Sequence, residues 1–227
     1  MHHLRDVISE KMIIFAYQLC EIMETTYRRY PIGIQNFEQL RNNNCVYIDK
    51  TELIYNLTHS DSVYFLSRPR RFGKSLLVST LEAYFQGKKH LFEGLAMERL
   101  ETEWTEYPVL HMDFSVSKYT DADKLREVLN IQISRWEKIY GKETDELTFS
   151  NRFEGVIQRA YQKTGKQVVV LVDEYDSPLL DTNSEPALQK ELRNIVRASF
   201  SPLKKNGPYL SFMLLKGIRY CINSTIL

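Results

Sequence analysis

The stretch that most constrains the fold joins a strand-like segment to a helix-like one and ends in Gly73-Lys74-Ser75. The apolar strand Val63-Tyr64-Phe65-Leu66 precedes it, and apolar residues then recur at helical spacing. In the pattern G-x-x-x-x-G-K-[ST], backbone N–H groups surround phosphates, the Lys reaches them and the hydroxyl joins a Mg²⁺ shell. The start of a helix also favours an anion. The stretch therefore predicts a phosphate-binding P-loop.

This loop departs from the general pattern at its first position. Arg68 stands where the pattern has a glycine that leaves the strand with positive φ. The alternative interpretation is a basic surface turn that happens to contain Gly-Lys-Ser. Lys74 is the candidate for stabilising charge during a reaction, and Ser75 is a candidate Mg²⁺ ligand. The full set of candidate phosphate-binding residues is Arg70, Arg71, Phe72, Gly73, Lys74, Ser75 and Leu76.

A second motif, a Walker B strand, is the continuous apolar run from Val168 to Val172, which ends in Asp173 and Glu174. A parallel strand buried on both faces shows no polar alternation, as here. Asp173 would hold Mg²⁺ through water, and Glu174 would act as general base towards an attacking water. The alternative is a buried strand capped by solvated acids. Together with the upstream loop, the motif predicts a site for ATP and Mg²⁺.

Strands and helices alternate along the chain, which predicts an α/β fold with a parallel sheet and right-handed crossovers. Nucleotide then binds at the carboxyl edge of the sheet. We expect strands at 63–66, 108–114, 168–173 and 209–215, and helices at 37–41, about 121–140, about 150–164 and from 184 onward, with a further helix after Thr51.

Composition agrees with one soluble domain that has a substantial core. The chain has 227 residues, 43% hydrophobic and 26% charged, and its net charge is only +1. A near-neutral charge argues against a nucleic-acid or membrane-surface protein, because such binding needs a broad basic field. The three cysteines are odd in number and widely spaced, which is typical of reduced cytoplasmic thiols. We therefore expect a cytoplasmic protein.

Three further polar residues have structural and functional interpretations. His111, inside an apolar strand, is expected to be a packed core or edge side chain. Asp113, near the end of that strand, either borders the site or caps a turn. Asp49 or Thr51 caps the helix that follows, or Asp49-Lys50 contacts nucleotide, and we favour the cap.

The chain resembles the bacterial AAA-ATPase-like proteins, which often carry a C-terminal nuclease-like domain. The resemblance runs from about Tyr27 to the C-terminus and covers nearly all of that stretch. The residues that carry it are Tyr30-Pro31-Ile32-Gly33, Phe37, Tyr47-Ile48-Asp49-Lys50-Thr51, Arg68-Pro69-Arg70-Arg71-Phe72-Gly73-Lys74-Ser75, Asp173-Glu174-Tyr175-Asp176 and Pro178-Leu179. In such proteins the P-loop commonly lacks the first glycine, which accounts for Arg68 at that position.

The resemblance implies a three-layer P-loop NTPase sandwich of the additional-strand catalytic-glutamate type. The strand at 209–215 would then insert between the P-loop strand and the strand ending at Asp173. Its end should carry a polar sensor for the γ-phosphate. Relatives place hydroxyl-bearing residues around the glycine equivalent to Gly217, whereas here Lys216 and Arg219 stand there. This departure makes hydrolysis less certain than binding.

The resemblance also implies that the chain is incomplete at its C-terminus. It stops before an expected fifth strand and helical lid, which would leave the far edge of the P-loop strand bare. We expect residues 1–22 to be an extension carrying an amphipathic helix, either adventitious or partner-binding, and residues 23–227 to form the ATPase-like domain.

Two functions therefore stay open. The first is ATP binding with hydrolysis. The second is a nucleotide-dependent interaction module that binds ATP without turnover and uses Tyr175, Asp176 and Leu179 as a surface for a protein partner or a second copy. A P-loop kinase ranks below both, because kinases usually need a basic lid.

Overall fold

The computed structural model describes residues 28–67, 69 and 71–217. The chain divides into two compact units, Met1–Ile48 and Asp49–Leu227. The domain boundary expected between residues 22 and 23 lies outside the described residues, as does the expected N-terminal helix. Of the candidate site residues, Arg70 and Arg219 also lie outside them.

The described part of the first unit is built around α2 (Phe37–Asn42). The Asn36 side chain caps this helix by accepting a hydrogen bond from the Gln39 amide at 3.0 Å. Phe37 is fully buried and packs edge-on against Tyr47, with ring centroids 5.2 Å apart. The expected helix at 37–41 is confirmed.

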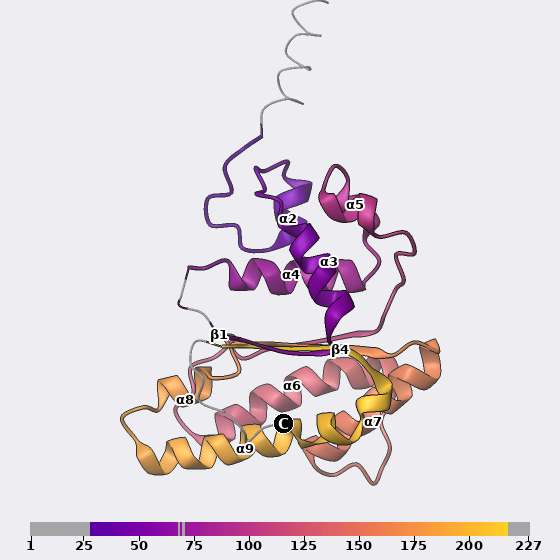
Figure 1. Ribbon diagram of the computed structural model, residues 1–227. Coiled ribbons are helices and arrows are strands. Elements are labelled where there is room, and N and C mark those ends of the chain that lie inside the picture. Colours follow the sequence, from indigo (N-terminus) through magenta and orange to yellow (C-terminus); the bar gives the residue numbers. More distant parts are fainter. Residues whose placement is uncertain (1–27, 68, 70, 218–227) are drawn as a thin grey trace, which may run out of the picture. The chain divides into compact units, whose positions relative to one another are not determined.

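The second unit is organised by a sheet of four parallel strands in the order β1-β4-β3-β2 (Figure 1). The strands are β1 (Val63–Ser67), β2 (Val109–Asp113), β3 (Val168–Asp173) and β4 (Leu210–Gly217). All four expected strands are therefore confirmed. The expected insertion of the last strand is confirmed too, because β4 pairs with β1 on one side and β3 on the other.

Helices cover both faces of this sheet. Figure 1 shows α4 on one face, and α6, α7 and α9 on the other. The helices of the unit include α3 (Thr51–Ser60), α4 (Lys74–Phe85), η1 (Lys89–Phe92), α5 (Ala96–Leu100), α6 (Ala122–Tyr140), α7 (Phe149–Thr164), α8 (Ser177–Asp181), α9 (Pro186–Lys205) and η2 (Gly207–Tyr209). The short elements η1, α5 and α8 lack the length for a clear periodic signal and were not expected.

Local side-chain contacts set where these helices begin. Asp121 accepts a hydrogen bond from the Lys124 amide at 2.7 Å at the start of α6, and Thr148 accepts one from Asn151 at the start of α7. Asp49 accepts from the Thr51 amide at 2.8 Å and from the Ala96 amide at 2.7 Å. It therefore ties the start of α3 to the start of α5. The hydrogen bond to the Thr51 amide agrees with the cap interpretation, although Lys50 occupies the N-cap position itself.

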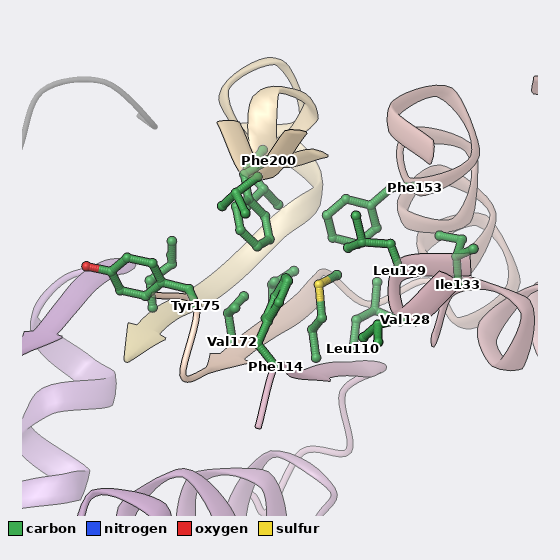
Figure 2. Close-up of a cluster of buried hydrophobic side chains, with 14 of the residues drawn as sticks. Leu110, Phe114, Val128, Leu129, Ile133, Phe153, Val172, Tyr175 and Phe200 are labelled. Carbon is green, nitrogen blue, oxygen red and sulfur yellow. The ribbon is translucent and has the colours of Figure 1, made fainter. Parts of the chain in front are cut away.

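The main core lies between the sheet and the helices α6, α7 and α9 (Figure 2). Alternate residues of β2, β3 and β4 enter it, such as Leu110 from β2 and Val172 from β3, and the same core contains Phe153 and Phe200. The intervening strand residues point to the opposite face of the sheet, towards α4. There Phe212 of β4 packs against Phe85. This alternation matters for the site, because it determines which face of the sheet the side chains at the strand ends point to.

The edge strand β2 is fixed by two polar contacts. The Gln132 side chain of α6 accepts from the Asp113 amide at 2.9 Å and donates to the Asp113 carbonyl at 3.0 Å. On the opposite face, His111 Nδ1 lies 2.9 Å from Glu82 Oε2 of α4. His111 is thus a partly buried edge side chain, as expected. In the described residues, no helix is both long and apolar enough to cross a membrane.

The contact between His111 and Glu82 predicts a pH-dependent stability. Burial lowers the pKa of His111, but the hydrogen bond to Glu82 and the nearby carboxylates outweigh it, so the pKa lies above its ordinary 6.5. Such a group stabilises the fold below its unfolded pKa, and this contribution is lost as the pH rises through the folded pKa. We expect the free energy of unfolding in urea to show this loss above about pH 6.5, and His111→Gln to flatten it.

His90→Gln is the matched control, because His90 is exposed. It should keep the slope of the unaltered chain. A slope that His111→Gln leaves unchanged would show that another group produces the pH dependence.

Candidate functional site

The loop between β1 and α4 has two left-handed residues at its end. Gly73, immediately before α4, has φ 71°, which glycine adopts without strain. Arg71 has φ 68°, which is uncommon for a residue with a side chain. Alternating backbone conformations of this kind turn successive N–H groups towards one concavity. Arg71, Gly73 and the first turn of α4 therefore follow the carboxyl end of β1 in a conformation of this kind.

Lys74 begins α4, and its side chain folds back over the loop. Its Nζ donates a hydrogen bond to the Pro69 carbonyl at 2.8 Å, and only 6% of the residue is exposed. Burial lowers the pKa of Lys74, and the charge of Lys216 lowers it further, while nearby carboxylates oppose both effects. The ammonium thus sits inside a cluster of charges rather than in solvent.

The two acids expected at the end of β3 lie beside this lysine. Asp173 ends the strand on the face towards α4 and is only 8% exposed. Burial raises the pKa of Asp173, and the contact with Lys216 opposes that rise. Glu174 follows in a left-handed conformation, with φ 52°. Its Oε2 accepts a hydrogen bond from Ser177 Oγ at 3.2 Å, which directs the carboxylate back towards the site.

Lys216, near the end of β4, connects the other groups. Only 1% of it is exposed. Its Nζ donates to Ser75 Oγ at 3.1 Å, contacts Asp173 Oδ1 and lies 3.4 Å from Glu174 Oε1. The expected polar residue at this strand end is therefore present, but it is a cation that engages the carboxylates. The sequence signal was its position at the end of a central apolar strand.

The strand ends are held together by backbone contacts. The Tyr175 amide donates to the Lys216 carbonyl at 3.2 Å, which joins the turn after β3 to β4. Next to it, a Cβ on Gly217 would lie 2.7 Å from Asp176 Oδ1, so a larger residue would push the two segments apart. The close approach fixes Lys216 relative to Asp173 and Glu174.

The structure brings together Lys74, Ser75, Asp173 and Glu174, all of them predicted from the sequence. Arg71 and Phe72 are exposed on the loop, with Phe72 63% exposed. Gly73 and Leu76 flank Lys74 and Ser75 at the start of α4.

Two other expectations are resolved by burial and hydrogen bonding. The Asp113 carboxylate accepts from the Ser115 amide at 2.7 Å, which agrees with a turn cap, and Asp113 also lies opposite Asp173 in the sheet register. The partner surface expected at Tyr175, Asp176 and Leu179 is wrong, because these residues are 3%, 0% and 2% exposed. Tyr175 and Leu179 instead belong to the main core, and Figure 2 shows Tyr175 there.

Comparison with known proteins agrees with this geometry. A family model described as "Predicted AAA-ATPase" matches residues 31–227. The chain is also similar to an "Uncharacterized protein in vnfD 5'region" of Azotobacter chroococcum mcd 1, at 36% identity over 197 residues. That match covers 84% of this chain but only 37% of the relative. No solved structure matches the chain significantly. Because the family model spans most of the chain, the protein belongs to the AAA-ATPase-like family.

Proposed function

We propose that this chain binds ATP at the start of α4, with the phosphates on the P-loop. The proposal rests on one observation. Lys74 and Ser75 lie close to Asp173, the last residue of β3, and to Glu174, which follows it. These groups come from separate elements and converge at the carboxyl edge, where nucleotides bind in open α/β sheets. The order β1-β4-β3-β2 and the Asp173-Glu174 pair support the additional-strand catalytic-glutamate subtype.

Phosphate would replace contacts that the loop makes to itself. Lys74 donates to the Pro69 carbonyl, a neutral acceptor. A phosphate oxygen is charged and accepts a stronger hydrogen bond, so we expect the Lys74 ammonium to transfer to it. The first amides of α4 have no acceptor in a preceding turn and favour an anion. Arg70, Arg71 and Phe72 would complete the loop side of the phosphate site.

Hydrolysis is the activity that the family implies, and Glu174 is its proposed general base. The left-handed backbone at Glu174 turns its carboxylate out of the strand direction, towards Ser177 and Lys216. A carboxylate in this place can accept the proton of a water that attacks the γ-phosphate. Lys74 would stabilise the charge that develops on the phosphate.

Binding without turnover is the second candidate, and the contacts of Glu174 favour it. Ser177 donates to Oε2, and Lys216 lies 3.4 Å from Oε1. Protein groups thus engage both oxygens of the carboxylate that would have to face an attacking water. The expected Mg²⁺ ligands, Ser75 and Asp173, are the oxygen groups that the Lys216 ammonium contacts.

Lys74→Ala should weaken ATP binding by at least about tenfold, the effect of losing a hydrogen bond to a charged group. The measurement is isothermal titration calorimetry on the purified chain. Lys190→Ala is the control, because it removes an exposed lysine of α9 and should leave the dissociation constant unchanged. Equal affinities for Lys74→Ala and the unaltered chain would rule out the P-loop as the binding site.

Glu174→Gln should retain ATP and lose about 10² or more in turnover, the effect of removing a positioned base. Phosphate release and ATP affinity are measured on the same preparation. If both proteins hydrolyse ATP equally, Glu174 has no part in the reaction. If the unaltered chain binds ATP but releases no phosphate, the second candidate is correct.

A further inference from the structure

Lys216 is a buried cation that hydrogen-bonds to Ser75 and Glu174 and forms an ion pair with Asp173. An ammonium group has three N–H donors, and burial of such a charge is tolerated only when it is paired and hydrogen-bonded. Ser75 Oγ, Asp173 Oδ1 and Glu174 Oε1 surround the Nζ of Lys216, at 3.1 Å for Ser75 and 3.4 Å for Glu174. The ammonium therefore bridges the P-loop helix and the end of β3.

The same oxygen atoms define the position of a metal in P-loop enzymes. There the loop hydroxyl and the acid that ends the neighbouring strand hold Mg²⁺ against the β- and γ-phosphates. In this chain those groups are Ser75 and Asp173, and both contact the Lys216 ammonium. Two cations cannot share one position, so the residues present do not fit a Mg²⁺ ion.

The main chain at Lys216 is fixed by the sheet, and its side chain is paired with the acids. Its backbone lies in the central strand β4, opposite Leu66 of β1, and its carbonyl accepts from the Tyr175 amide. Moving the side chain away would leave Asp173, which is 8% exposed, without its cation. The ammonium is therefore held in place by both the sheet and the acids.

We propose that the Lys216 ammonium takes the place of the divalent cation, so that this chain binds ATP without Mg²⁺. The inference rests on the proposed ATP binding. The contact to Glu174, at 3.4 Å, is longer than the contact to Ser75 and is the weaker hydrogen bond. A phosphate oxygen of ATP would therefore replace Glu174 as the third acceptor of the ammonium.

This arrangement has a consequence for chemistry. An ammonium carries one positive charge where Mg²⁺ carries two, so it neutralises less of the charge on the triphosphate. It binds phosphate through hydrogen bonds, whereas a metal also polarises the oxygen atoms that it ligates. Metal-independent binding is thus expected to accompany slow turnover, in line with the second candidate function.

The first test compares ATP affinity in Mg²⁺ and in excess EDTA, by calorimetry on the unaltered chain. The proposal predicts dissociation constants within about threefold of each other, because the ammonium supplies the counter-charge in both conditions. ATP binding that requires Mg²⁺ would overturn the inference while leaving the proposed function intact. No ATP binding in either condition would overturn the proposed function and the inference together.

The second test uses Lys216→Met, which keeps much of the side-chain volume and removes the ammonium. Its ATP affinity in EDTA should fall by at least about tenfold and should recover with Mg²⁺, because the metal position is then open. Lys190→Met, at an exposed lysine, should keep metal-independent binding. Equal affinity of the Lys216→Met variant with and without Mg²⁺ would contradict the proposal.

The fold of this variant needs its own check. Removing the ammonium leaves the buried Asp173 carboxylate without a cation, which destabilises the site. Circular dichroism reports whether the variant is folded. If it is not, the comparison of Mg²⁺ and EDTA on the unaltered chain still decides the question.

Discussion

The pairing of β4 between β1 and β3 is the constraint on which the site depends. Because the strands are parallel, their carboxyl ends meet at one edge, and the loop that leads to α4 leaves β1 at that edge. Strand periodicity then sends the side chains of Asp173 and Lys216 to the face that α4 covers. The position of β4 therefore places the Lys216 ammonium between Ser75 and the two acids, Asp173 and Glu174.

The fold was largely predictable because its signals are local and repeated. The strand β3 is apolar on both faces, which marks a central parallel strand before any partner is known. The long helices α6, α7 and α9 show clear periodicity and have recognisable starts at Asp121, Thr148 and Pro186. The order of the strands required more than periodicity, and the resemblance to a known family supplied it.

The site was predictable in its members but not in their contacts. Lys74, Ser75, Asp173 and Glu174 follow recognisable motifs, so their convergence was expected. The contact of Lys216 with three of these residues depends on the register of β4 and on side-chain packing, which local patterns do not encode. The same limit explains Tyr175, which follows an acidic motif and yet packs into the core.

The most direct test of the account is to locate ATP on the chain by nuclear magnetic resonance of the backbone amides. The account predicts that ATP shifts the amide signals of residues 73–76 most strongly, with a second set at Glu174 and Lys216. Signals along the exposed face of α6, around Arg126 and Asn130, should stay in place. Shifts at α6, with none at residues 73–76, would contradict the assignment of the nucleotide site.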